Sequence, residues 1–363
     1  MILTIISIVL FIIVFIIVHE FGHFFAAKLF KVPVKEFGIF YPPRLWGKKI
    51  GETLYSINAI PLGGFVRIVG EDMEMGEDEP EKKEGQGTSL GFSHLAAYKR
   101  VIILASGVLM NFVFAWLVLS VVFMVGIPAG IVITSVEPNS PAEIGGAKVN
   151  DVIVGARSTE GELSGEIDPE TFVDFINKHA GQEVVLKVER GSDIVELKTN
   201  PRAHPPAGEG ALGVSLAEMG LPQKGLFDAL WSGLVTATRI LGFIYKALFD
   251  LITQAFVSGG GGLRGVVNSL GGPVLIFTFG YQAGSMGFVY LLQFFVSISL
   301  SLVALNILPF PPLDGGHILF ILVEKIKGSP LSPKIRFRIS KYGMMALVGL
   351  MIIVTIKDIL GHV

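Results

Sequence analysis

Four apolar stretches, each long enough to cross a lipid bilayer, limit the folds open to this 363-residue chain more than any other feature. They cover approximately residues 1–27, 101–125, 286–308 and 342–360. A helix needs about 20 apolar residues to cross the hydrocarbon core of a membrane. Because backbone groups in lipid must be hydrogen-bonded within the segment, each stretch is predicted to be a transmembrane helix.

The composition agrees with a membrane protein that also has solvated parts. Hydrophobic residues make up 51% of the chain and charged residues 17%. The net charge of -2, without basic grooves interleaved with aromatic residues, argues against nucleic acid as a partner. The chain has no cysteine, which excludes disulfides, thiolate metal ligands and a cysteine nucleophile. Histidine, aspartate and glutamate are then the side chains available to bind a metal.

Basic residues lie at only one end of each apolar stretch, and this predicts the orientation of the chain. Lys28 and Lys31 follow the first stretch, Arg100 precedes the second, residues 325–338 follow the third and Lys341 precedes the fourth. Such ends favour the cytoplasmic side, so both termini are predicted to lie outside. The first stretch has neither a positive region before it nor a small-residue cleavage site after it, so we interpret it as a retained helix (segment 1–30).

Two segments around the second span (96–125) are predicted to lie outside the lipid. Residues 31–70 alternate in the manner of short strands, with turns at 41–43 and at Gly63-Gly64, which indicates a small sheet at the cytoplasmic membrane face. Residues 71–95 are acidic and poor in apolar side chains, so we expect a disordered loop there.

Residues 126–220 form the longest soluble segment, and their acidic excess places it outside. The string from Gly130 to Val154 predicts a strand, a turn, a short helix and a second strand. This order resembles a PDZ domain, a family in which a glycine-containing loop holds a peptide carboxylate beside an exposed strand edge. The alternative is a small sheet domain without a ligand. The candidate loop consists of Gly210, Ala211, Leu212 and Gly213.

The segment 221–284 is predicted to hold two non-spanning elements. Its first part is apolar but is interrupted by charged residues from Asp228 to Asp250, which favours an interfacial helix over a span. The second part is rich in glycine around Pro273, and we expect a hinge or a re-entrant loop there. Residues 285–320 are assigned to the third span and the proline-containing segment that follows it, and residues 340–361 to the fourth span.

The first span ends in His19-Glu20-Phe21-Gly22-His23, a His-Glu-x-x-His pattern. The spacing places both imidazoles on one helix face about 6 Å apart, so one helical turn can supply two zinc ligands. Glu20 points about 100° away from His19, which suits a base that acts on metal-bound water. Three ionisable side chains beside an apolar run cost up to about a few kcal/mol each, and such residues usually face a cavity. The alternative is that they only mark the interfacial end of the helix.

A catalytic zinc takes three protein ligands and keeps one position open, so a third ligand is needed. The segment from Asn306 to His317 contains prolines that stop the third span, and its Asp314 is followed by two glycines that permit close backbone approach. The first and third spans run in the same direction, so His19 and Asp314 arrive at the same membrane depth. The alternative for Asp314 is a solvated turn residue. His317 is a candidate outer partner or an alternative ligand.

The pattern His19 to His23, Asn111 in the second span and the segment Asn306 to Gly316 together resemble the site-2 protease family of intramembrane metalloproteases. The likeness is greatest to its bacterial RseP-like branch with a single PDZ domain. The resemblance implies zinc (Zn2+) bound by His19, His23 and Asp314, with Glu20 as the general base. It implies a polytopic α-helical membrane protein with a membrane-associated β-sheet and an inserted extracytoplasmic PDZ-like α+β domain.

The resemblance also implies partners, a location and further site residues. The expected substrates are transmembrane proteins in regulated intramembrane proteolysis, such as an anti-sigma factor or a signal-peptide remnant. The expected location is the bacterial cytoplasmic membrane, with the active site toward the cytoplasm and the PDZ domain outside, where it binds a substrate C-terminus or restricts entry. A non-catalytic PDZ-containing scaffold and an ion pathway are the alternatives. The residues expected to bind substrate are Asn111, Gly63, Gly64 and Asn306, and the strand edge expected to capture an unwound substrate lies within Ile57 to Val69.

Overall fold

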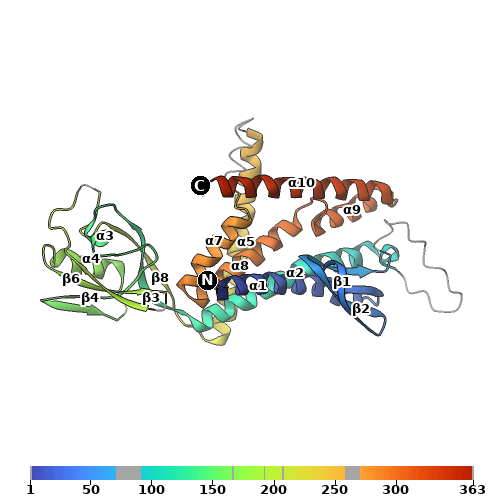
Figure 1. Cartoon of the computed structure of the whole chain (residues 1–363). Helices are drawn as coiled ribbons and strands as arrows, with labels where there is room; N and C mark the ends of the chain where they lie inside the picture. The colour runs from blue at the N-terminus through green and yellow to red at the C-terminus, as the bar shows by residue number, and fades with distance from the viewer. Residues whose placement is uncertain are drawn as a thin grey trace. The chain divides into compact units, whose positions relative to one another are not determined.

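The structure of the protein is a computed structural model, which describes residues 2–70, 91–165, 167–191, 193–206, 208–257 and 270–361. The chain forms two compact units (Figure 1). The first unit contains Met1–Leu117, Leu234–Tyr281 and Phe295–Val363, and the second contains Val118–Gly233 and Gln282–Phe294. Most of the predicted disordered loop, residues 71–90, lies outside the described residues, as do residues 258–269 of the glycine-rich segment.

Within the described residues, four helices are long and apolar enough to cross a membrane, and they coincide with the four stretches predicted as spans. The last of them begins earlier than predicted because Pro333 lies in its first turn, where a missing N–H costs nothing. The four helices are α1 (Ile2–Leu29), α2 (Ala97–Val125), α8 (Phe288–Ile307) and α10 (Pro333–Leu360).

Aromatic side chains join three of these helices inside the first unit. The rings of Phe11 on α1 and Phe295 on α8 stack with their centroids 3.8 Å apart. Phe15, one turn further along α1, meets Phe114 of α2 edge-on at 5.6 Å. Phe15 and Phe295 are fully buried or nearly so. These contacts hold α1 beside α2 and α8, as apolar side chains of facing helices do in a packed bundle.

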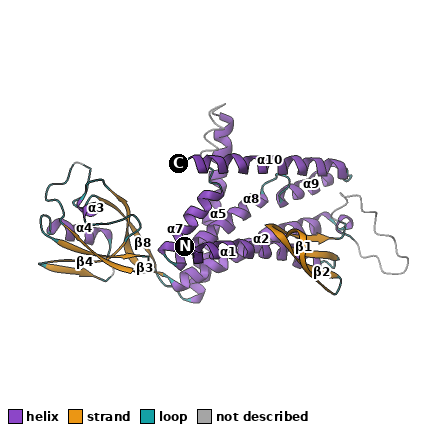
Figure 2. Ribbon diagram, viewed as in Figure 1, coloured by secondary structure: helices purple, strands orange, loops and turns teal. Residues whose placement is uncertain are grey.

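A small sheet follows α1, in the segment where the sequence predicts one. It consists of β1 (Val34–Ile50) and β2 (Thr53–Ile68), which pair antiparallel. The chain reverses between them at Gly51, whose φ of 61° is a conformation that glycine adopts readily. Figure 2 shows the two strands of this sheet in orange.

Both strands of this sheet bend back on themselves. Gly38 of β1 pairs with both Ser56 and Phe65 of β2, so β2 lies on both sides of it. Ser56 in turn pairs with both Gly38 and Gly47, so β1 also folds back. The bend in β1 contains Pro42 and Pro43, in agreement with the turn predicted there. Proline has no N–H to donate to a ladder, and a bend is one of the places in a sheet where it is tolerated.

Three further helices belong wholly or partly to the first unit. The first is α5 (Leu226–Val257), a single helix where an interfacial helix was predicted, and it is not among the four described helices that are both long and apolar enough to cross a membrane. The second is α7 (Pro273–Met286), which replaces part of the predicted re-entrant region. Gly271 and Gly272 lie directly before this helix and not within its first turn. The backbone N–H of Gly272 donates a hydrogen bond to the buried carboxylate of Asp358 at 2.8 Å.

The third is α9 (Asp314–Lys327), which the sequence did not predict as a helix. A Cβ on Gly315 would overlap the carbonyl oxygens of Ile307 and Leu308, and one on Gly316 would lie 2.6 Å from the backbone nitrogen of Pro311. The helix therefore starts directly against the end of α8, an approach that only glycine permits. Asp314 is thus the first residue of a helix and does not lie in an irregular loop.

A buried carboxylate ties α9 to two other helices. Glu324 binds Arg100 of α2 at 3.1 Å and Arg336 of α10, and it accepts the backbone N–H of Leu331 at 2.8 Å. Burial raises the pKa of Glu324, but these donors outweigh it, so the pKa lies below its ordinary value. The charged form persists, and the C-terminal end of α9 is held in place relative to α2.

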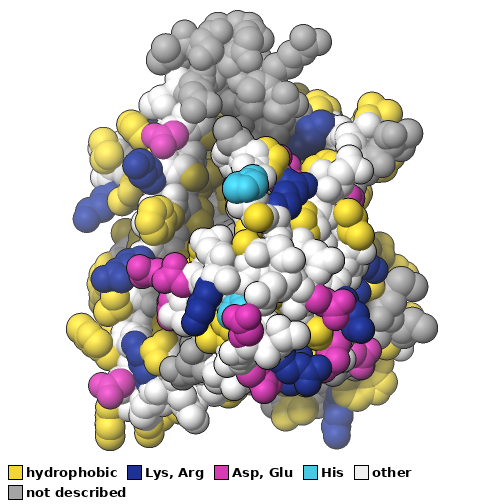
Figure 3. All heavy atoms as spheres, turned by 90° about the vertical axis from the view of Figure 1, so that its left-hand side faces the viewer, with side chains coloured by type: hydrophobic (Ala, Val, Ile, Leu, Met, Phe, Trp, Pro, Cys, Tyr) yellow, Lys and Arg dark blue, Asp and Glu magenta, His cyan; other side chains and the backbone are white. Residues whose placement is uncertain are grey.

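The second unit contains a six-stranded sheet and two short helices, together with the adjoining ends of α2, α5, α7 and α8. The strand order is β7-β6-β4-β3-β8, with β5 paired to β4. In the view of Figure 3, acidic and basic side chains are interspersed over the face toward the viewer, as a solvated surface requires. The elements are β3 (Ile127–Val136), α3 (Pro141–Ile144), β4 (Val152–Ser158), β5 (Gly161–Ser164), α4 (Pro169–Lys178), β6 (Val184–Arg190), β7 (Asp193–Thr199) and β8 (Val214–Leu221).

Candidate metal centre

Two imidazoles project from one face of α1 at the end of its apolar stretch. The Nε2 atoms of His19 and His23 are 3.2 Å apart, and the ring planes are inclined at 87°. The i, i+4 spacing produces this arrangement, since residues four apart are neighbours on a helix surface. His23 is 9% exposed, so this face lies against protein.

Asp314 of α9 brings a carboxylate to the same point. Its Oδ2 is 3.2 Å from His19 Nε2, and its Oδ1 is 3.7 Å from His23 Nε2. One ligand atom from each of the three residues lies within 4.8 Å of the others. Tetrahedral zinc, with bonds of about 2.0–2.1 Å, holds its ligand atoms roughly 3.3 Å apart. The three side chains therefore match a zinc site in donor type and in spacing, and Oδ2 of Asp314 has no hydrogen-bond partner among the described residues.

The outward nitrogens of both imidazoles meet groups that orient them. His23 Nδ1 lies 2.8 Å from the carbonyl oxygen of Ile103 on α2, which can accept its hydrogen. His19 Nδ1 lies 3.4 Å from the side-chain nitrogen of Asn111, whose Oδ1 has no partner in the described part of the chain. Rotation of this amide by 180° turns the oxygen to a protonated Nδ1 and satisfies both groups. In this tautomer the hydrogen is on Nδ1, and the lone pair of each Nε2 is available to bind a metal.

Two glycines allow α1 and α2 to approach closely behind this site. A Cβ on Gly107 would overlap His23 Nε2 and lie 2.9 Å from His19 Cε1. A Cβ on Gly22 would overlap the carbonyl oxygen of Ser106. Any larger side chain at Gly107 would occupy the space in which the imidazoles converge. The glycine is therefore part of the site, although it offers no ligand.

A cavity of about 420 Å³ opens onto His19, His23 and Asp314, and we call it the zinc cavity. Glu20 also lines it, together with residues of β2 and α9. A Cβ on Gly64 would lie 2.8 Å from Glu20 Cγ, so the strand passes directly over this carboxylate. Residues 64–68 are paired with β1 on one side only, while residues 54–57 have partners on both sides. Within the predicted segment from Ile57 to Val69, residues 64–68 therefore have an open edge, and Ile57 does not.

The remaining predicted site residues lie in different surroundings. Asn111 is 2% exposed and its side chain faces His19, so its contact with substrate stays a prediction. Asn306 lines a separate apolar cavity of about 430 Å³ between α2, α8 and α9. Gly63 packs against the ring of Tyr41, and the loop from Gly210 to Gly213 belongs to the second unit, before β8.

The sequence did not single out two of the side chains that line the zinc cavity, Tyr41 and Arg336. Tyr41 was noted only as part of a turn, and Arg336 only as one of several basic residues after the third span. No local pattern marks either residue. His317, which the sequence left as an outer partner or a ligand, also lines the cavity and meets the ring of Phe320 edge-on at 5.8 Å.

Comparison with known proteins agrees with this geometry. The model of a family described as Peptidase family M50 matches residues 7–350. A protein of Clostridium perfringens with the provisional name zinc metalloprotease is 32% identical over 344 residues, which is 95% of each chain. A Nostoc protein with the same provisional name is 31% identical over 94% of this chain and 92% of its own. A chloroplast protein of Arabidopsis thaliana, provisionally named a membrane metalloprotease, is 28% identical over 95% of this chain and 77% of its own. Because the family model covers most of the sequence, this protein belongs to peptidase family M50, the site-2 protease family.

Proposed function

We propose that this protein is a zinc metalloendopeptidase that hydrolyses peptide bonds of transmembrane proteins. The observation that carries the proposal is the convergence of His19, His23 and Asp314 in the cavity that also contains Glu20. The relatives named as zinc metalloproteases support it. Glu20 lies in the same cavity as the three potential zinc ligands, and a non-catalytic scaffold of the same fold would not require a carboxylate there. The geometry therefore favours the enzyme.

The residues of the site divide the chemistry between them. Zinc, when bound, supplies an acidified water and an electrophile for the scissile carbonyl. His19, His23 and Asp314 hold it, and the Ile103 carbonyl and Asn111 keep the imidazoles in the binding tautomer. Glu20 is not needed as a ligand, so it can accept the proton of the attacking water and deliver it to the leaving nitrogen.

A transmembrane substrate has its amides bonded within its own helix, so it must unwind before its carbonyls can react. The open edge of residues 64–68 offers free backbone groups to an unwound segment, and Gly64, Phe65 and Val66 line the zinc cavity. We infer that the substrate adds to this edge as a strand. Main-chain pairing depends little on side chains, which fits an enzyme that accepts different apolar sequences.

We infer that the second unit is a PDZ-type domain on the extracytoplasmic side. Two features support this inference. The loop from Gly210 to Gly213 leads directly into β8, which is an edge strand, and α4 contacts β8. The loop is held by the buried side chain of Leu212 and by Gly213, whose φ is 68°. A groove between an edge strand and a helix, closed by a glycine loop, is the arrangement that binds a peptide C-terminus.

The proposed PDZ groove predicts preference for a free carboxylate. A peptide with a free C-terminus is expected to bind the full-length protein at least about tenfold more tightly than its C-terminal amide, since hydrogen bonds to a charged group contribute about 1.5–3 kcal/mol. Fluorescence anisotropy with the labelled pair measures this. Equal binding of both peptides would argue for a domain that only restricts substrate entry.

Removal of the metal is expected to abolish cleavage reversibly. The protein purified without chelator should contain about one zinc per chain, and dialysis against 1,10-phenanthroline should stop cleavage of a model membrane protein in proteoliposomes. Zinc should restore activity, and the same concentration of magnesium should not, because magnesium prefers sites made of oxygen ligands. Full activity in the metal-free protein would rule out the proposed function.

A further inference from the structure

A tyrosine of the small sheet faces the zinc cavity. Tyr41 lies in the bend of β1 and lines this cavity together with Glu20 and Asp314. A Cβ on Gly63 would lie 2.7 Å from Tyr41 Cε2, just as a Cβ on Gly64 would lie 2.8 Å from Glu20 Cγ. The phenol and the carboxylate are therefore packed against consecutive residues of one strand. Both groups also line the cavity that residues 64–66 of the open edge border.

The ring of Tyr41 is fixed while its hydroxyl is left available. The ring stacks on Phe65, with centroids 6.2 Å apart and planes inclined at 17°. The residue is 43% exposed, and within the described residues no hydrogen bond to its hydroxyl is found. Burial, and then the charge of Glu20, raise the pKa of the phenol above its ordinary value of 10.0, so it carries its proton at neutral pH.

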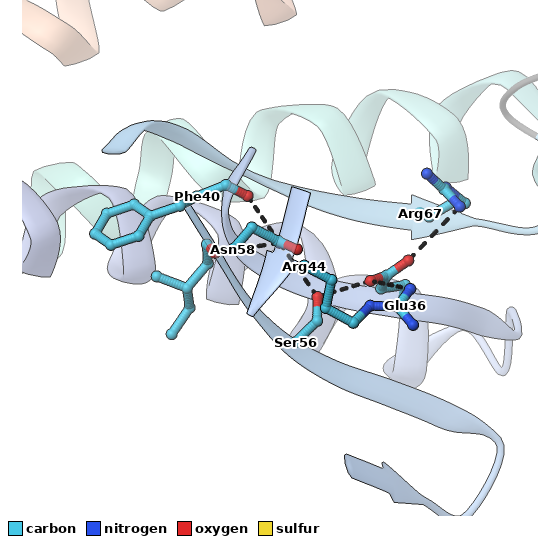
Figure 4. A network of polar contacts seen from close by, with 7 residues as sticks. Glu36, Phe40, Arg44, Ser56, Asn58 and Arg67 are labelled. Atoms are coloured by element: carbon cyan, nitrogen blue, oxygen red, sulfur yellow. Dashed lines mark hydrogen bonds and ion pairs between the residues drawn. The ribbon is translucent and has the colours of Figure 1, made fainter. Parts of the chain in front are cut away.

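A buried carboxylate closes the bend that presents this tyrosine (Figure 4). Glu36, before the bend, is 5% exposed and binds Arg44, after the bend, at 3.1 Å. Ser56 Oγ donates to the same oxygen at 2.7 Å, and Arg67 approaches the other oxygen at 3.6 Å. The ends of the bend are therefore joined to each other and to both halves of β2.

An amide holds the middle of the bend. Asn58 Nδ2 donates to the carbonyl oxygens of Phe40 at 3.0 Å and Ile39 at 3.3 Å. Phe40 has a φ of 69°, an uncommon conformation for a residue other than glycine. The hydrogen bond from Asn58 to its carbonyl oxygen holds the backbone at this position. The backbone on the N-terminal side of Tyr41 is thus anchored directly, and Figure 4 shows the amide pointing into the bend. Such support pre-organises a side chain for a role in the adjacent cavity.

Peptide hydrolysis creates a need for a donor at this place. When water adds to the peptide carbon, the carbonyl oxygen gains negative charge, and a pre-positioned donor that meets this oxygen accelerates the step. Of the other polar side chains that line the cavity, Arg336 is already bound by Glu324, and the ring of His317 packs edge-on against Phe320. On the basis of the proposed function, we propose that the Tyr41 hydroxyl donates a hydrogen bond to the carbonyl oxygen of the scissile bond as it becomes charged. Tyr41 is then a catalytic residue beside Glu20.

The replacement Tyr41→Phe tests this role because it removes the hydroxyl and keeps the ring that stacks on Phe65. The expected result is a fall in kcat of about 10²-fold, the usual effect of losing one such donor, with KM changed less than about twofold. Tyr55→Phe is the matched control, since Tyr55 lies in the same sheet, packs against Phe24 and Phe37 and does not line the cavity. The control should leave kcat unchanged. An unchanged kcat in Tyr41→Phe would overturn the proposal.

Binding of two inhibitors separates catalysis from positioning. A phosphinic peptide carries the negative oxygen of the reacting carbonyl, whereas a hydroxamate with the same side chains only ligates the metal. By calorimetry, Tyr41→Phe is expected to weaken the phosphinic peptide about 10²-fold and the hydroxamate less than about threefold, with zinc content unchanged. Equal weakening of both ligands would make Tyr41 a packing residue and overturn the proposal. A wild-type protein that holds no zinc and cleaves nothing would instead reject the proposed function itself.

Discussion

Replacement of Glu20 by glutamine is expected to abolish cleavage while zinc remains bound. Glutamine has the shape of glutamate but cannot accept the proton of the attacking water, and a general base contributes about 10²–10⁴-fold to a rate. The three ligand atoms come from His19, His23 and Asp314, so the metal content should stay near one per chain. Cleavage of a model membrane protein in proteoliposomes, together with zinc analysis of the same preparation, measures both expectations.

The Glu20→Gln variant also allows the substrate path to be mapped. Since the chain contains no cysteine, a single cysteine introduced at Val66 is unique and can be crosslinked to a trapped substrate. Crosslinks are expected from Val66, on the open edge, and not from Val195 of the second unit. Wild-type cleavage by Glu20→Gln would reject Glu20 as the base, and loss of zinc from this variant would point to a role in metal binding.

Replacement of Asp314 by alanine is expected to remove both zinc and activity. Two imidazoles from one helical turn would remain, and a catalytic zinc needs three protein ligands. Since loss of an outer-shell partner already weakens metal binding by about 10–100-fold, loss of a ligand should exceed that range. We expect less than about a tenth of the wild-type zinc content after dialysis, and a rate reduced by more than about 10³-fold.

An exposed acidic residue provides the control for this variant. Asp250 lies on the exposed face of α5, and Asp250→Ala should keep both zinc and activity. Because Asp314 is the first residue of α9, circular dichroism should show that the helical content of the Asp314→Ala variant is retained. If the folded variant kept one zinc per chain, Asp314 would not be the third ligand, and His317 would be the next candidate.

Much of the architecture could be predicted because it depends on local properties of the chain. The length of an apolar run decides whether a helix can cross a bilayer, and four such runs correspond to the four membrane-length helices of the described chain. The i, i+4 spacing of His19 and His23 places two imidazoles together without reference to the rest of the fold. The turn around Pro42 and Pro43 likewise follows from the missing N–H of proline.

Other features could not be predicted because they depend on contacts between distant segments. The helix that starts at Asp314 was missed because its two glycines are poor helix formers, and what favours the helix is their close packing on the end of α8. Nothing local shows that Gly107 is needed beside the imidazoles, or that Tyr41 reaches the zinc cavity. Each depends on which side chain meets it across a helix or strand interface.

The sequence alone therefore determined the four long apolar helices and the placement of two imidazoles on one helix face beside Glu20, since helical periodicity and hydrophobic length act within a few turns. The tertiary structure decided where the third carboxylate meets them, which half of β2 keeps an open edge and which phenol faces the cavity. The reason is steric: the approach of α9, α2 and β2 to α1 is set by glycines whose importance appears only once the opposing surfaces are in contact.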